Sequence, residues 1–102
     1  MMGSRLELHE QLCEILGSRN VYYQPPESLR IVYPAIVYAK DAIQRELAND
    51  AGYIRDDRYM VTFIARNVDD EVIDKLLEFP HISYNRRYAT EGLYHDVFTL
   101  YY

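Results

Sequence analysis

The sequence is poor in cysteine and lacks tryptophan. Cys13 is the single cysteine among 102 residues. One thiol excludes an internal disulfide framework and is typical of a protein kept in a reducing compartment. We therefore expect a domain that folds on a hydrophobic core without covalent cross-links.

Basic residues are also scarce. Eleven Lys and Arg stand against sixteen Asp and Glu, which gives a formal net charge of −5 at pH 7. Proteins that hold nucleic acid displace counterions from the phosphates with Lys and Arg. The chain has one adjacent basic pair, Arg86-Arg87, which is too short to form a basic patch. A nucleic-acid-binding role is therefore disfavoured.

Long apolar runs are missing as well. No stretch is long enough for a transmembrane helix, and the first residues lack the apolar core of a signal peptide. There is no internal repeat and no linker. The length then predicts a single domain over residues 1–102 with no membrane partner.

Tyrosine is the residue type in surplus. The chain has eleven Tyr and three Phe. Tyr favours strands and suits surfaces that are half buried or half wet. The surplus is consistent with cross-strand packing and equally with a protein interface, where Tyr is enriched. The C-terminal part is especially rich in it, at Tyr84, Tyr88, Tyr94, Tyr101 and Tyr102.

The strongest folding signal lies in residues 58–80. Residues 59–65 are apolar at odd and even positions, which predicts a central strand covered on both faces. A helix is expected next, with Asn67 as its N-cap and the acids of 69–71 in its first turn. Pro80 is expected to end this helix.

The N-terminal part predicts a helix and two strands. A capping box at Ser4 begins a helix over 4–16 with apolar residues at helical spacing, and Gly17 ends it. Strands are expected at 21–23 and 33–38.

The charged segment 41–57 is predicted as a long excursion between two antiparallel strands. Ile43 and Leu47 are one helical turn apart, so we expect a helical turn near 41–47. A connection of this length in a compact domain is usually functional or mobile.

The C-terminal part predicts a hairpin. Strands are expected at 82–88 and 94–101, joined at 90–92 by a loop of about three to five residues. Strict alternation would put Tyr84 and Arg86 on one face and Arg87 on the other. The fold class is therefore α+β: a mostly antiparallel sheet of about four to five strands with two helices packed on it, in the order α-β-β-β-α-β-β.

The sequence predicts no catalytic, metal-binding or cofactor-binding residue. His9 and Cys13 are four apart on a helix, but a zinc site needs about four ligands, and His81 and His95 stand alone. Cys13 with a distant histidine could form a thiol nucleophile pair, but no oxyanion-type loop accompanies it.

Acidic and basic clusters have simpler interpretations. The acids at 69–71 and Asp74 are expected to stabilise a helix N-terminus rather than bind a cation. His95 and Asp96 are strand neighbours and cannot share a face. The Arg86-Arg87 pair is either solvated or bound to a carboxylate of a partner. No enzyme activity is expected.

A family resemblance covers residues 6–102. The order of elements resembles the tail-completion or tail-terminator proteins of long-tailed bacteriophages and prophages. The segments that carry the resemblance are LHEQLCEILGS, VYYQPPE, YPAIVY, RYMVTFIAR, VDDEVIDKLLEFP and HDVFTLYY.

The resemblance implies a ring, usually of six subunits, on the head-proximal end of the tail tube. Such a ring stops tube polymerisation and offers a surface to the head connector. It implies as partners the chain itself, a tail-tube protein and a head connector protein, with DNA only as passing cargo. It also implies assembly in the bacterial host cytoplasm and residence in the tail neck of the virion.

A closed ring needs two different patches on each subunit. We expect these patches in the 41–57 excursion and in the tyrosine-rich hairpin. Three other classes stay open: a head–tail connector or other minor virion protein, a regulatory module that binds a host protein on a sheet edge, and a small enzyme. The candidate interface residues are Ile43, Leu47, Tyr53, Ile54, Arg55, Arg86, Tyr88, Tyr94, Tyr101 and Tyr102.

Overall fold

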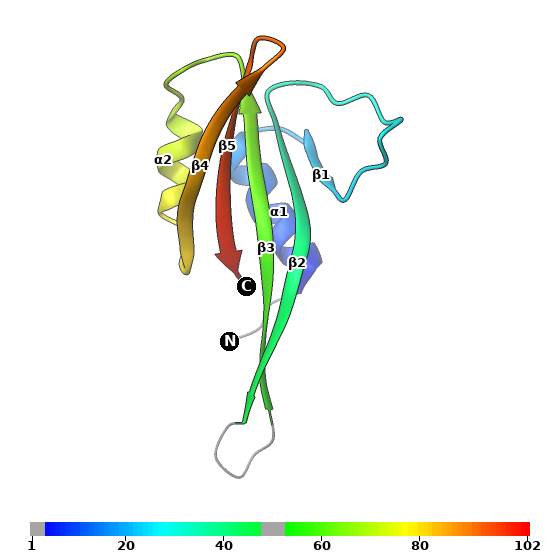
Figure 1. Cartoon of the computed structure of the whole chain (residues 1–102), viewed down its shortest axis with the longest axis vertical. Helices are drawn as coiled ribbons and strands as arrows, with labels where there is room; N and C mark the ends of the chain where they lie inside the picture. The colour runs from blue at the N-terminus through cyan, green and yellow to red at the C-terminus, as the bar shows by residue number, and fades with distance from the viewer. Residues whose placement is uncertain (1–3, 48–52) are drawn as a thin grey trace.

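The computed structural model describes residues 4–47 and 53–102, and the side chains of 4–43 and 57–102. In this part of the chain, two helices and five strands form an α+β fold in the predicted order (Figure 1). The elements are α1 (Arg5–Leu16), β1 (Val21–Tyr23), β2 (Ala35–Leu47), β3 (Tyr53–Ala65), α2 (Glu71–Leu77), β4 (Ile82–Thr90) and β5 (Leu93–Tyr101).

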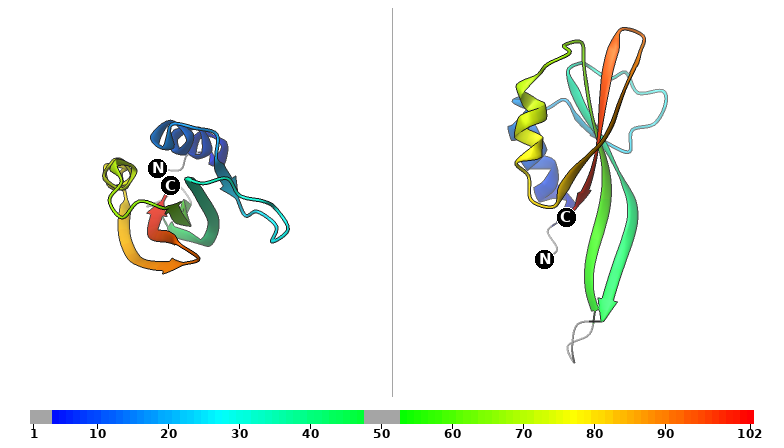
Figure 2. Two further views of the ribbon diagram at one scale, coloured as in Figure 1. Left: turned by 90° about the horizontal axis from the view of Figure 1, so that it is seen from above. Right: turned by 60° about the vertical axis from the view of Figure 1, so that its left-hand side comes forward.

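The strands form one sheet in the order β1-β2-β3-β5-β4. β1 is parallel to β2, and the other three pairs are antiparallel. Both helices pack on the same side of this sheet (Figure 2). The fold class is confirmed.

The helix α1 forms where its local signals predict. The Ser4 Oγ accepts a hydrogen bond of 3.1 Å from the Glu7 backbone N–H, and the left-handed Gly17 (φ 82°) closes the last turn. Leu8 and Leu12 are fully buried against the sheet. Burying such side chains stabilises the fold by roughly 1.5–3 kcal/mol each.

One core lies between the helices and the sheet. Alternation along the strands brings one face of β2, β3 and β5 to this core, and burial of their side chains holds the two layers together. The core members with the least exposure are Leu8, Leu12, Ile36, Tyr38, Val61, Phe63, Leu76, Phe98 and Leu100.

The strand β3 is central, as predicted, but the expected cover on both of its faces is only partial. Met60, on the face away from the helices, is 44% exposed. Ile64 on that face is buried, and Thr62 is half-buried. Both helices pack on one side of the sheet, so the other side is more open to water, and Thr62 tolerates this wetter side.

The predicted excursion with a helical turn is also wrong, because residues 41–47 continue β2. From Ala42 opposite Arg58 to Leu47 opposite Tyr53, β2 pairs continuously with β3. β1 ends opposite Tyr38 and β5 ends opposite Arg58. Residues 41–47 and 53–58, here called the arm, therefore form a two-stranded ribbon that extends beyond the sheet (Figure 1).

The N-cap of α2 differs from the prediction. Asp70, not Asn67, caps the helix: its Oδ1 accepts a hydrogen bond of 3.0 Å from the Val72 backbone N–H. The helix ends at Leu77, before Pro80. The acids at its start do serve the helix terminus, as expected.

The hairpin between β4 and β5 is tighter than predicted. Thr90 pairs with Leu93, so the loop has two residues, Glu91 (φ 52°) and Gly92 (φ 76°). Positive φ at both positions is the type I′ geometry, whose twist matches that of the strands.

Replacing Gly92 with Ala is expected to lower the free energy of unfolding by about 1 kcal/mol. A Cβ there would meet no atom within 4 Å, so the cost is backbone strain alone. Gly92→Asn is the matched control, because Asn tolerates this conformation and should cost less. Urea denaturation measures both. Equal stability of Gly92→Ala and the wild type would contradict the turn geometry.

Candidate functional site

Two ion pairs fix the base of the arm. The Lys40 Nζ lies 3.0 Å from the Asp57 Oδ2, and the Arg58 Nε lies 3.0 Å from the Asp41 Oδ2. The hydrogen bond to Asp57 raises the pKa of Lys40, and hydrogen bonds to Tyr101 and Asp41 raise the pKa of Arg58. The arm therefore leaves the sheet at a defined position.

The arm brings half of the predicted interface residues together. Ile43 is 52% exposed. Leu47 pairs with Tyr53, Glu46 pairs with Ile54, and Arg55 pairs with Arg45. The side chains of Leu47, Tyr53, Ile54 and Arg55 lie outside those described, so the structure places these residues by backbone register. Figure 1 shows that the arm extends past both helices at one end of the molecule.

A second group lies on β4 and β5, on the face away from the helices. The rings of Tyr88 and His95 stack at 4.6 Å with an interplanar angle of 11°, and the Arg86 guanidinium lies 5.5 Å from the Tyr88 ring. Tyr88 is 43% exposed. Exposed Arg86 and Tyr88 thus form an aromatic and basic surface together with the half-buried His95.

The remaining predicted residues have partners within the chain. The Tyr102 ring packs 5.9 Å from Phe79, and its hydroxyl accepts a hydrogen bond of 2.9 Å from the Gln11 side chain. Arg87 lies 5.4 Å from the Tyr94 ring. Tyr94 and Tyr101 are half-buried. The structure therefore divides the tyrosine-rich hairpin into packing residues and one exposed surface.

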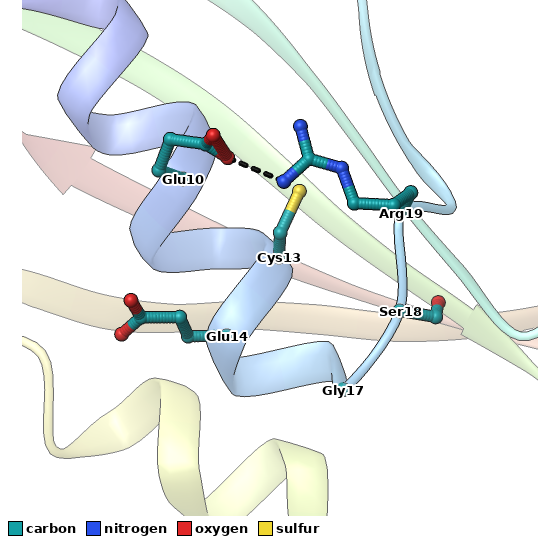
Figure 3. A pocket seen from close by; sticks show the side chains of 6 residues that line it. All are labelled: Glu10, Cys13, Glu14, Gly17, Ser18 and Arg19. Atoms are coloured by element: carbon teal, nitrogen blue, oxygen red, sulfur yellow. Dashed lines mark hydrogen bonds and ion pairs between the residues drawn. The ribbon is translucent and has the colours of Figure 1, made fainter.

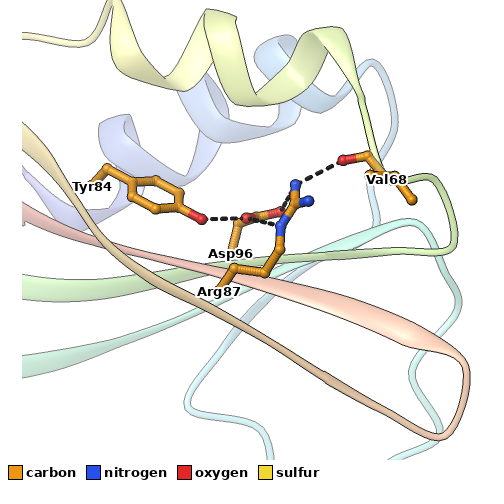
Figure 4. A network of polar contacts seen from close by, with 4 residues as sticks. All are labelled: Val68, Tyr84, Arg87 and Asp96. Carbon is orange, nitrogen blue, oxygen red and sulfur yellow. Dashed lines mark hydrogen bonds and ion pairs between the residues drawn. The ribbon is translucent and has the colours of Figure 1, made fainter.

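A buried carboxylate clamps β4 to β5 and to the segment before α2 (Figure 4). Asp96 is 2% exposed. It accepts hydrogen bonds of 2.7 Å and 3.2 Å from Arg87 and of 2.7 Å from the Tyr84 hydroxyl. Arg87 also donates to the Val68 carbonyl at 2.7 Å. The hydrogen bond to Asp96 raises the pKa of Tyr84 and that of Arg87.

The role of Asp96 was missed by sequence reasoning. A register shift between Tyr84 and Arg86 breaks the expected alternation, so Arg87 pairs with Asp96 while Arg86 pairs with Val97. Arg87 is therefore bound to a carboxylate of its own chain, although part of its side chain stays exposed. The usable signal was one acid within an otherwise apolar strand.

The hollow beside Cys13 is a weak candidate for chemistry (Figure 3). Glu10, Glu14 and Arg19 line it with Cys13, and Arg19 binds Glu10 at 2.6 Å. Cys13 is 6% exposed, and burial raises the pKa of its thiol. A raised pKa leaves little thiolate at neutral pH, so the thiol is a poor nucleophile.

His9 and Cys13 do not converge on a metal. The His9 Nδ1 lies 2.8 Å from the Tyr38 hydroxyl, on the sheet side of α1. Among the side chains that the structure describes, those of 4–43 and 57–102, no group of three or more His, Cys, Asp or Glu could hold a metal ion. No helix in the same residues is long and apolar enough to cross a membrane.

The stability of the fold is expected to fall in mild acid because of His9. Burial, with Arg19 and Arg5 nearby, lowers the pKa of His9 below its usual 6.5. The unfolded chain then takes up a proton before the folded chain does. The contribution of His9 is present above pH 6.5 and is lost as the pH falls through the folded pKa. Denaturation across this range should show a smaller pH dependence for His9→Gln, and an unchanged dependence would contradict it.

A comparison with protein-family models finds no match, and a comparison with curated proteins finds no relative.

Proposed function

We propose that the chain is a virion assembly protein that acts as a phage tail terminator. Copies form a ring that caps the head-proximal end of a tail tube and provides the joining surface for the head connector. The protein is assembled in the cytoplasm of the bacterial host and resides in the tail neck. Its partners are further copies of itself, the tail-tube protein and the head connector protein.

The arm is the observation that carries the proposal. An isolated two-stranded hairpin is only marginally stable in water. In the described residues, no strand flanks the arm beyond Tyr38 on one side and Arg58 on the other. Exposed Ile43 adds apolar surface to it. Such a ribbon gains stability from a partner surface, which a ring of identical subunits supplies.

A second exposed surface shows that each copy carries more than one patch, as a head-to-tail ring requires. Heterologous contacts join one patch of a subunit to a different patch of the next. Arg86, Tyr88 and His95 are remote from the arm along the sheet and differ from it in chemistry. The chain's charge of −5 also suits a channel that lets DNA pass without holding it.

Three reactive side chains of the described residues are held within the fold, which favours action by contact rather than catalysis. Asp96 is bound by Arg87, and His9 lies against Tyr38. Cys13 is buried with a raised thiol pKa.

Polymerisation of a phage tail-tube protein tests this function. Added at a few copies per tube, the wild-type chain is expected to stop growth at one end and shorten the tubes seen by electron microscopy. Unchanged tube lengths together with no co-sedimentation would contradict the proposal. A pull-down against portal-side proteins separates the alternative, a head–tail connector, which would bind those proteins and leave the tubes alone.

A regulatory binding module is the second candidate, favoured by the edge strand β4. Every residue of β4 after Ile82 is exposed, and β4 is the outermost strand of the sheet. An exposed edge can accept an extended segment of a partner by strand addition. This candidate predicts a monomer that captures a peptide, and it fails if the chain assembles with itself.

A further inference from the structure

The two faces of the arm differ in charge. Tyr59, Val61 and Phe63 face the helices. Alternation along β3 therefore assigns three cross-strand pairs of the arm to the same face: Ile43 with Asp57, Arg45 with Arg55, and Leu47 with Tyr53. That face carries Arg45 directly opposite Arg55, with apolar or aromatic residues at Ile43, Leu47 and Tyr53.

The helix-side face of the arm is basic. Its acid, Asp57, is bound by Lys40 at 3.0 Å. Like charges placed directly opposite each other on neighbouring strands destabilise the pair. The positions of Arg45 and Arg55 therefore favour a negatively charged surface against this face.

The opposite face of the arm has the reverse sign. It holds Glu46 and Asp56, and Arg58 there is bound to Asp41. The ribbon is thus basic on the side of the helices and acidic on the other side.

A surface of complementary charge and hydrophobicity lies on α2. Exposed Asp69 and Asp74 line a hollow of about 470 Å³ together with Glu71, which Lys75 binds at 3.5 Å. Ile73 and the 46% exposed Leu77 supply its apolar lining. The basic residue at the hollow, Arg87, is already bound to Asp96. The helix α2 therefore leaves an acidic and apolar face without a covering element among the described residues.

We propose that the helix-side face of one copy's arm docks on the α2 face of the next copy. The contact sets the basic face of the arm against the acidic face of α2, and apolar residues are placed on both faces. Within one chain this contact is excluded, because α2 packs beside β4 while the arm extends from β2 and β3 at the other end (Figure 1). The contact joins two different patches, so it propagates from copy to copy. It rests on the proposed self-assembly and assigns its interface.

Charge reversal on each side tests the docking. Arg45→Glu with Arg55→Glu changes the arm, and Asp69→Arg with Asp74→Arg changes α2 while keeping the Asp70 cap. Each double variant alone is expected to self-associate at least roughly tenfold more weakly than the wild type, because like charges then meet. An equimolar mixture of the two should regain association, since each contact in an alternating assembly pairs opposite charges. Sedimentation velocity measures all three.

Two double reversals serve as controls. Glu46→Arg with Asp56→Arg alters the other face of the arm, and Glu7→Arg with Glu14→Arg alters exposed acids of α1. Both are expected to associate like the wild type. Circular dichroism confirms that each variant is folded.

The outcomes separate the docking from the function. A wild-type chain that never self-associates, alone or on tail tubes, overturns the proposed function and the docking with it. If the wild-type chain self-associates, and both charge reversals associate like the wild type when measured separately and when mixed, the docking is overturned but the proposed function is not. The docking is also overturned if the control variants lose as much self-association as the test variants.

Discussion

Asp96→Ala is expected to lower the free energy of unfolding by about 2–3 kcal/mol. Breaking a buried ion pair leaves the partner charge without compensation, and here Arg87 and the Tyr84 hydroxyl both lose their acceptor. The Arg87 side chain is 31% exposed, so water replaces part of what it loses. The decrease in the free energy of unfolding should therefore lie at or below the lower end of the range for breaking a fully buried ion pair.

Thermal and urea denaturation measure this loss. For a domain of this size, the melting temperature should fall by roughly 10 °C or more. Arg86→Ala is the matched control, because Arg86 is exposed on the adjacent position and should change stability by about 0.5 kcal/mol at most. Stability of Asp96→Ala within that same margin would show that the clamp between β4 and β5 contributes little.

Removing the arm is expected to weaken self-association strongly and leave the rest of the domain folded. Ile43 and Asp57 are directly paired, so residues 44–56 can be replaced by a two-residue Asn-Gly turn of type I′. The ion pairs of Lys40 with Asp57 and of Arg58 with Asp41 stay in place. The core residues lie outside the deleted segment.

For this variant, self-association and the stability of the fold are measured side by side. We expect the urea midpoint to stay close to that of the wild type, while association weakens by roughly a hundredfold or more. A shortened chain that still forms the wild-type assembly would place the interface elsewhere, with the Arg86, Tyr88 and His95 surface as the next region to change.

The parts of the fold that sequence predicts well depend on local chemistry. The Ser4 cap, the spacing of Leu8 and Leu12 and the left-handed Gly17 act within a few residues of each other, and α1 forms as expected. β3 is recognisable as a central strand because its residues are largely apolar at both odd and even positions.

The arm was misjudged because its spacing fits two structures. Ile43 and Leu47 are four residues apart, which matches one helical turn and also one face of a strand. A ribbon without a covering layer needs no buried stripe, so its sequence lacks the alternation that identifies strands. At its base the pairing joins residues more than ten positions apart, such as Ala42 with Arg58.

The Asp96 clamp was not predictable for a different reason. One inserted residue between Tyr84 and Arg86 reverses which side chains face the helices. Bulges depend on how two strands meet and leave little trace in the sequence of one strand. In a similar way, Asn67 and Asp70 are both good N-caps, and the path of the chain into α2 selects Asp70.

The size of the wild-type chain in solution, measured by light scattering from micromolar to high concentration, tests the central claim most directly. We expect a discrete species of several copies, whose population increases with concentration or which forms on the end of tail tubes. A strict monomer at every concentration that also forms no ring with tail-tube protein would contradict it.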